Sequence, residues 1–229
     1  MSNHYFKFRR FTVYQDCCAM KVGTDGVLLG AWARCGSRVL DIGTGTGLVA
    51  LMMAQRCPSA NVVGVEIDHE SARQARDNVE ASGFQHIEIV EADIRDFYEG
   101  VYDTIVCNPP YFVDSLISPD EQRTVARHAV TLTYRELVKA VCRLLADDGE
   151  FSVVIPFDSL QRFEQETVLA GLFKVRQCVV RTTPRKQPRR CLVAFRRHPA
   201  PLELTEGVIE EQPNVRTAWY QELTKEFYL

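Results

Sequence analysis

The fold is decided by residues 39–47, which read VLDIGTGTG. The first four form a short, mostly apolar run that is typical of a buried strand in a parallel sheet. The alternate glycines Gly43, Gly45 and Gly47 allow a tight turn and keep side chains away from a ligand. Their spacing after Asp41 differs from the Gly-x-Gly-x-x-Gly of dinucleotide-binding folds. Because ligands of open parallel sheets bind at the carboxyl ends of the strands, we expect a ligand site at this turn.

Strands and helices alternate after this turn. The pattern predicts strands at 39–42, 61–67, 87–91, 102–107, 150–156, 175–181 and 191–197, with helices at 48–56, 68–82, 133–146 and 159–171. Asp68 is expected to cap the second helix, and Gly83 to end it. The last two strands are joined by a loop alone, so we expect them to be antiparallel at one edge. The chain is therefore predicted to be α/β, with a Rossmann-like, seven-stranded, mostly parallel sheet, an antiparallel last strand and helices on both faces.

The length of 229 residues suits one well-buried domain. We expect a single domain over 1–229, with an N-terminal extension at 1–37, the core sheet at 38–199 and a C-terminal tail at 200–229. The tail is predicted to be weakly structured as far as a short helix at 217–229. The sequence has neither an apolar run of eighteen residues nor a signal-peptide pattern, which predicts a cytoplasmic protein, and a monomer is favoured.

Eight cysteines are present, and only Cys17 and Cys18 are close in the sequence. Neither a Cys-x-x-Cys motif nor a Cys/His cluster with metal-ligand spacing occurs, so we expect no metal site. Most of the cysteines lie in apolar stretches, which indicates buried and reduced thiols.

Basic residues are concentrated near the end of the predicted sheet. The net charge of −3 argues against a protein that coats nucleic acid by charge alone. However, residues 181–197 hold seven basic residues and no acidic one. The turn in this stretch carries Arg185, Lys186, Arg189 and Arg190. We interpret the turn as a surface that docks a polyanion, and a solvated edge strand is the alternative.

Acidic residues end the second and third predicted strands. Glu66 follows Asp41 by 25 residues, and its carboxylate could accept both hydroxyls of a ribose. The alternative for Glu66 is a charge that favours the next helix terminus, a role that Asp68 fills better. Asp93 could accept from an adenine amine, with the backbone of Ile94 donating, although a lone Asp after a strand is usually a turn residue.

The fourth predicted strand ends in Asn108-Pro109-Pro110-Tyr111. Two prolines exclude a helix and leave two backbone nitrogens without protons, so the turn presents mainly carbonyl acceptors. The Asn108 side-chain oxygen and the Pro109 carbonyl could hold both protons of an exocyclic amine, and Tyr111 could stack on its ring. A structural Pro-Pro turn is the alternative.

These motifs resemble a known family. The glycine turn, the acidic end of the second strand and the Asp93 turn resemble class I S-adenosylmethionine-dependent methyltransferases over roughly 21–197, and Asn-Pro-Pro-Tyr resembles the signature of amino-methyltransferases. Residues 15–32, which read QDCCAMKVGTDGVLLGAW, and the EFYL at 226–229 are similar to bacterial tRNA1(Val) adenine methyltransferases, which act on adenosine 37 beside the anticodon. The resemblance implies methylation of the N6 amine of an adenosine in tRNA, with S-adenosylmethionine as cofactor.

The resemblance also implies site residues. The glycines would line the methionine moiety, and Asp25 could accept from its ammonium group. The full expected cofactor set is Lys21, Thr24, Asp25, Asp41, Gly43, Thr44, Gly45, Gly47, Glu66, Ile67, Asp93, Ile94 and Asn108. The catalytic set is Asn108, Pro109, Pro110 and Tyr111. The expected substrate contacts are Phe112, Arg127 and His128, with the basic turn residues Arg185, Lys186, Arg189 and Arg190.

Other functions remain open from the sequence. An N6-adenine or N2-guanine methyltransferase of rRNA or DNA shares these motifs, but no target-recognition region for DNA is visible. A release-factor glutamine methyltransferase carries a helical domain before the glycine turn, and the 40 residues before Asp41 are too few for one. A non-catalytic RNA-binding module is a further alternative, which cofactor binding would distinguish.

Overall fold

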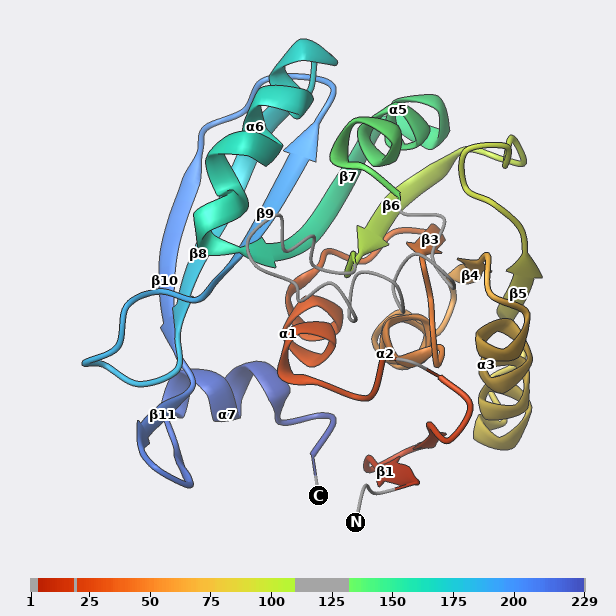
Figure 1. Ribbon diagram of the computed structural model, residues 1–229, viewed down its shortest axis with the longest axis horizontal. Helices are drawn as coiled ribbons and strands as arrows, with labels where there is room; N and C mark the ends of the chain where they lie inside the picture. The colour runs from red at the N-terminus through yellow and green to blue at the C-terminus, as the bar shows by residue number, and fades with distance from the viewer. Residues whose placement is uncertain (1–3, 19, 110–131, 229) are drawn as a thin grey trace, which may run out of the picture.

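The computed structural model describes residues 4–18, 20–109 and 132–228 (Figure 1). The N-terminal half contains β1 (Tyr5–Lys7), β2 (Thr12–Tyr14), α1 (Thr24–Trp32), β3 (Arg38–Ile42), α2 (Leu48–Arg56), β4 (Asn61–Glu66), α3 (His69–Ser82), β5 (Ile87–Glu91) and β6 (Tyr102–Cys107). The C-terminal half contains α5 (Tyr134–Leu144), β7 (Leu145–Pro156), η1 (Phe157–Ser159), α6 (Leu160–Leu169), β8 (Phe173–Arg181), β9 (Arg190–Arg196), β10 (Glu203–Val208), β11 (Glu210–Gln212), β12 (Val215–Arg216) and α7 (Ala218–Thr224).

An eight-stranded sheet forms the centre, in the order β10-β8-β9-β7-β6-β3-β4-β5. Five neighbouring strands of this sheet are parallel to one another, namely β7, β6, β3, β4 and β5. β9 runs antiparallel between β7 and β8. The predicted α/β class and mostly parallel sheet are confirmed, and the sheet has one strand more than the seven predicted.

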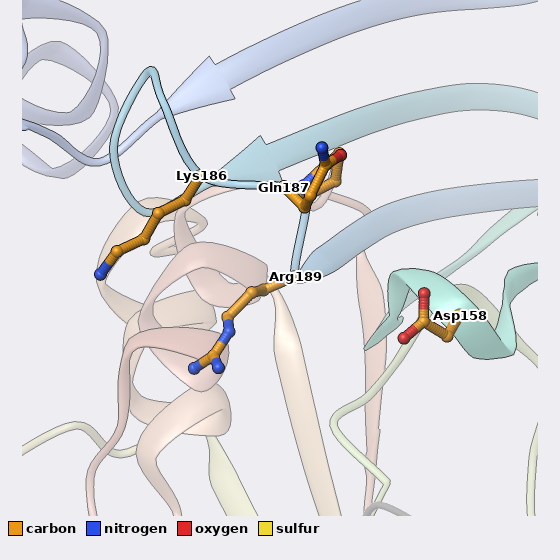
Figure 2. A pocket seen from close by; sticks show the side chains of 5 residues that line it. Asp158, Lys186, Gln187 and Arg189 are labelled. Carbon is orange, nitrogen blue, oxygen red and sulfur yellow. The ribbon is translucent and has the colours of Figure 1, made fainter.

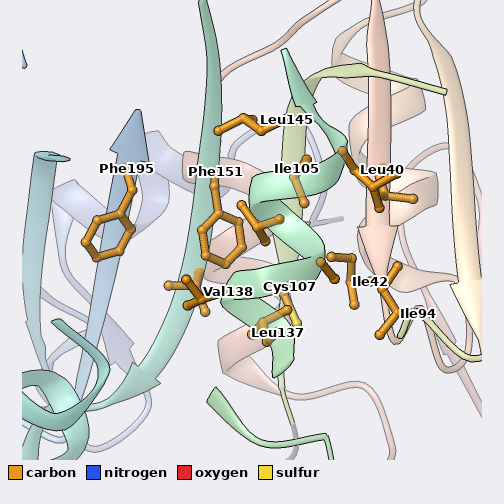
Figure 3. Packing of buried hydrophobic residues seen from close by; sticks show 14 of the residues in the cluster. Leu40, Ile42, Ile94, Ile105, Cys107, Leu137, Val138, Leu145, Phe151 and Phe195 are labelled. Atoms are coloured by element: carbon orange, nitrogen blue, oxygen red, sulfur yellow. The ribbon is translucent and has the colours of Figure 1, made fainter. Parts of the chain in front are cut away.

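Helices cover both faces of the sheet (Figure 1). On one face, α5 and α6 pack on the strands, and Figure 3 shows Leu137 and Val138 of α5 against Phe151, Ile105 and neighbouring strand residues. On the other face, α1, α2 and α7 bury a second cluster that includes Leu28, Leu29, Met53 and Tyr220. The central strands β3, β6 and β9 bury residues on both faces and their sequences are mostly apolar runs, which is why these strands could be predicted.

Short-range signals set the helix ends as expected. The Asp68 side chain accepts a hydrogen bond of 2.8 Å from the Ser71 amide at the start of α3. Gly83 follows α3 with φ +74°, a left-handed conformation that favours glycine. At the start of α5, Thr133 and Glu136 form a reciprocal capping box, which was not predicted.

The prediction of a weakly structured stretch after residue 200 was wrong. β10 joins the sheet edge in parallel with β8, with Glu203 opposite Arg176 and Val208 opposite Arg181. Its side chains are mostly exposed, so the strand is held by backbone pairing and carries no apolar pattern that a sequence reading could detect. The predicted short helix is present as α7.

The prediction that the cysteines are reduced was wrong for one pair. Cys35 and Cys57 form a disulfide, with Cα atoms 5.8 Å apart. The separation of 22 positions hides the pairing in the sequence, because β3 and α2 must fold back to bring the loop after α1 next to the end of α2. In the described part of the chain, no helix is long and apolar enough to cross a membrane.

Candidate active site

The predicted site residues gather at one edge of the sheet. Parallel strands end at the same edge, so Ile42, Glu66, Glu91 and Cys107 close β3, β4, β5 and β6 there. In the pairing of β3 with β6, Ile42 lies opposite Cys107. The glycine turn that follows Ile42 therefore lies next to Asn108 and Pro109, which follow Cys107.

The glycine turn has the conformation that its sequence predicts. Gly43, Gly45 and Gly47 have φ values of +68°, +56° and +80°. A Cβ built on Gly43 or Gly45 would meet no atom within 4 Å, whereas one on Gly47 would lie 3.5 Å from the Cβ of Ala75. The first two glycines therefore border open space that a ligand can approach, whereas Gly47 lies at ordinary contact distance from α3 and its positive φ is what favours glycine.

Glu66 is fixed at this turn by the backbone. Its Oε2 accepts from the Gly45 amide at 2.9 Å, and its Oε1 accepts from the amides of Ile67 at 2.9 Å and Asp68 at 3.0 Å. The side chain is half-buried. Since each carboxylate oxygen can accept two bonds, Oε2 keeps capacity for a hydroxyl beside the glycine turn.

Asp41 lies behind the turn. Its side chain is 1 % exposed, and Oδ2 accepts from the Thr44 hydroxyl at 2.6 Å and from the Ala50 amide at 3.1 Å. These bonds tie the turn to the first turn of α2, so Asp41 positions Thr44 and the glycines. Burial raises the pKa of Asp41 from 3.8 to about 7.

This pKa gives a pH dependence of stability. Between about pH 4 and pH 7 the folded chain holds one proton more than the unfolded chain, because the Asp41 pKa rises on folding. The Asp41 contribution to the free energy of unfolding should therefore fall as pH rises through this window, by up to about 1.4 kcal/mol per pH unit, and level off above pH 7. Urea unfolding of wild type and Asp41→Asn at pH 5, 6, 7 and 8 measures it. Equal pH slopes for the two proteins would contradict the assigned cause.

Asp93 is held by Arg95, which was not among the predicted site residues. Arg95 donates from Nε to both carboxylate oxygens of Asp93, at 2.9 and 2.8 Å, and its own amide donates to Oδ1 at 2.9 Å. These bonds lower the pKa of Asp93, and Arg95 also pairs with Glu136 at 3.5 Å. The sequence Asp-x-Arg could have predicted this pairing, because the two residues are only two positions apart. Asp93 is thus kept ionised and oriented, while Ile94 beside it is buried.

Asn108 and Pro109 lie at the end of β6. Asn108 is half-buried, its Nδ2 lies 3.7 Å from the Met20 sulfur, and Pro109 is buried. A Cβ on Gly26 of α1 would approach Asn108 Nδ2 to 3.8 Å, so the start of α1 lies beside the proposed amine-holding group. The predicted residues Pro110, Tyr111, Phe112, Arg127 and His128 lie outside the described residues.

The start of α1 brings Asp25 into contact with another predicted site residue, Arg190. Gly23 is the N-cap, so Thr24 and Asp25 lie inside the first turn, with Thr24 half-buried and Lys21 exposed. Asp25, expected at the cofactor ammonium, forms an ion pair with Nε of Arg190, expected on the substrate surface. The structure thus connects two side chains that the sequence had assigned to different ligands.

The basic turn lies at the same edge as the glycine turn. β8 is antiparallel to β9, which is antiparallel to β7, so β8 ends at the edge where the parallel strands end. Lys186, Gln187, Pro188 and Arg189 line a pocket with Asp158 of η1, and Figure 2 shows the lining side chains. The amide of Phe157 donates to the Arg189 carbonyl at 3.1 Å and joins the two walls. Asp158 was not predicted, and Arg185 is exposed on the same turn.

Comparison with known proteins agrees with this geometry. A family model described as Methyltransferase small domain matches residues 22–184. A tRNA1(Val) (adenine(37)-N6)-methyltransferase from Bacteroides thetaiotaomicron is 48 % identical over an alignment of 241 positions. The alignment covers 100 % of this chain and 99 % of that protein. A protein of the same name from Tolumonas auensis is 38 % identical over 233 residues, with 100 % and 98 % covered.

Solved structures share the fold. A predicted O-methyltransferase from Agrobacterium tumefaciens superposes with a TM-score of 0.68 at 20 % identity, over 89 % of this chain and 96 % of that one. A methyltransferase from Pyrococcus furiosus gives 0.55 at 21 % identity, over 74 % and 79 %. The glycine turn, the Asn108 edge and the full-length relatives lead to one conclusion: this chain belongs to the tRNA1(Val) (adenine(37)-N6)-methyltransferase family.

Proposed function

We propose that this chain transfers a methyl group from S-adenosylmethionine to N6 of adenosine 37 in tRNA1(Val). The observation that carries the proposal is the register of β3 with β6, in which Ile42 lies opposite Cys107. This register supports the proposal, because the residues that follow the two strands, the glycine turn on one side and Asn108 and Pro109 on the other, leave neighbouring strand ends. The names of the full-length relatives supply the expected substrate.

The chain fits the cofactor at three points. The open space at Gly43 and Gly45 would admit the methionine moiety, because neither residue has a side chain to fill that space. Glu66 would accept from the ribose, and Asp93, kept ionised by Arg95, would accept from the adenine amine. When bound, S-adenosylmethionine supplies a methyl group on a positively charged sulfur. Lys21, Thr44 and Ile67 complete the proposed surroundings.

The chemistry left to the chain is positioning. An exocyclic amine is a poor nucleophile, because its lone pair is delocalised into the ring. Asn108 and the Pro109 carbonyl would each accept one N6 proton, which favours a pyramidal nitrogen and aims its lone pair. The product then loses a proton to water, so no strong base is required. Tyr111 and Phe112 are proposed to stack on the substrate, and Arg127 and His128 to contact it.

One experiment tests the activity. Nucleoside mass spectrometry of tRNA1(Val) from cells with and without the gene should show N6-methyladenosine that depends on the gene. The purified protein should methylate the matching transcript, and a transcript with guanosine at position 37 should remain unmodified. Equal modification in both strains, together with no activity in vitro, would contradict the proposal. The enzyme is expected to act in the cytoplasm, as a monomer and without a metal.

The basic turn is the proposed tRNA surface. Replacing Arg185, Lys186 and Arg189 by Ala should weaken tRNA binding. A variant that contacts fewer phosphates releases fewer counterions from the tRNA when it binds. The slope of log affinity against log salt concentration should become shallower by about one unit for each lost contact. Filter binding at several salt concentrations measures this, with cofactor affinity as the control that should not change. An unchanged slope would place the tRNA surface elsewhere, with Lys7, Arg9 and Arg10 as the next candidates.

A further inference from the structure

The ion pair between Asp25 and Arg190 connects two parts of the proposed site. Arg190 is the first residue of β9 and directly follows the basic turn that carries Lys186 and Arg189. Asp25 lies in the first turn of α1, directly before Gly26, whose position faces Asn108 and Leu48. The pair therefore links the proposed tRNA surface to the helix start beside the glycine turn.

Both members of the pair are largely removed from water. The Arg190 side chain is 17 % exposed and that of Asp25 is 19 % exposed. A charge in such a place needs a counter-charge, because an uncompensated charge that is shielded from water costs free energy. A ligand that separates the pair must therefore offer each charge a replacement.

Two ligands of the proposed reaction carry those replacements. The ammonium group of the cofactor has the charge that Asp25 needs, and a tRNA phosphate has the charge that Arg190 needs. Arginine suits this exchange, since its guanidinium has several N–H donors and binds phosphate with defined geometry.

We infer that Arg190 is a positioning residue that couples the two ligands by exchanging partners. In the free protein Arg190 occupies Asp25. A tRNA phosphate draws Arg190 away, and Asp25 then accepts from the cofactor ammonium. Each ligand separates the same pair, so the first to bind meets the cost of separation and the second binds more tightly. This coupling is reciprocal by thermodynamic necessity. The inference rests on the proposed function and concerns the regulation of that same site.

The inference predicts an uncommon mutant phenotype. In Arg190→Gln, Asp25 has lost its competitor, so S-adenosylmethionine should bind more tightly without tRNA than it does to wild type. A residue with a merely structural role would instead weaken cofactor binding when removed. In wild type, tRNA should raise cofactor affinity on the order of 5- to 150-fold, the usual range of such couplings. In Arg190→Gln this factor should fall towards one.

Calorimetric titration of the full chain with S-adenosylmethionine, with and without tRNA1(Val) transcript, performs the test. Arg190→Lys should retain part of the coupling, because it keeps the charge. Asp25→Asn should bind the cofactor more weakly and should also lose the coupling. Arg181→Gln is the matched control: Arg181 pairs with Glu206 at 2.5 Å at the end of β8, and its loss should leave the coupling intact.

Three results would overturn the inference: no effect of tRNA on cofactor affinity in wild type, undiminished coupling in Arg190→Gln, or weaker cofactor binding by that variant. Thermal unfolding shows whether Arg190→Gln is folded, and Arg190→Lys with Asp25→Asn decide the matter where it is not. Failure of the proposed function looks different, because wild type would then not methylate tRNA at all. A wild type that methylates adenosine 37 but shows no coupling rejects only the exchange of partners.

Discussion

Replacing Asn108 by Ala should lower single-turnover methylation of tRNA on the order of 100-fold or more, with cofactor affinity little changed. The side-chain oxygen of Asn108 is proposed to hold one N6 proton, an interaction that aims the lone pair for attack. Loss of such a preorganised group affects the transition state much more than it affects binding. Rapid-quench methylation of tRNA1(Val) transcript at saturating cofactor measures the rate.

The chain offers a matched control for Asn108. Asn61 is exposed at the first position of β4, at the amino-terminal end of the parallel strands and so on the side away from the site. Asn61→Ala should methylate at the wild-type rate. An Asn108→Ala protein that is folded and retains near-normal single-turnover methylation would remove Asn108 from the proposed amine-holding role.

Glu66→Ala should weaken S-adenosylmethionine binding by about 1–3 kcal/mol, or roughly 5- to 150-fold in Kd. The variant loses the proposed bonds to the ribose and also three backbone bonds, one from Gly45 in the glycine turn and two from Ile67 and Asp68 after β4. Glu66→Gln keeps one acceptor oxygen and should fall between Ala and wild type. Calorimetry measures the affinities, and circular dichroism checks the fold.

Glu91 is the matched control for Glu66. It ends the neighbouring strand β5 directly opposite Glu66, and its carboxylate pairs with His69 at 3.0 Å and Arg76 at 3.6 Å. Glu91→Ala should leave cofactor affinity at the wild-type value. An unchanged affinity in a folded Glu66→Ala protein would exclude Glu66 from the cofactor site.

Local patterns explain which parts of the fold the sequence could predict. Helix α2 at Leu48–Arg56 and strands β5 and β6 match their predicted bounds, because a glycine turn, a proline or an apolar run marks each one. The glycine conformations and the Asp68 cap were also predictable from adjacent residues. By contrast, β10 has an exposed, polar sequence, and its position depends on backbone pairing with β8.

The site shows the same division. The topology brings Glu66, Asp93 and Asn108 to one edge, as their places after predicted strands implied. The pairing of Asp25 with Arg190 was not predictable, because the two residues lie 165 positions apart in the sequence and their contact depends on how β9 packs against α1. The grip of Arg95 on Asp93 is local, and the two-residue spacing could have revealed it.

The Cys35–Cys57 disulfide also acts on the unfolded chain. The loop that it closes contains β3, the glycine turn and α2, which is the whole first unit of the proposed cofactor site. Closing a loop of this length lowers the entropy of the unfolded ensemble by an amount worth about 3 kcal/mol at 25 °C in the chain-entropy model. Reducing and oxidising buffers therefore define two thermodynamic reference states for this protein. Any unfolding midpoint or ligand-induced shift in melting temperature is comparable only between samples of the same thiol state.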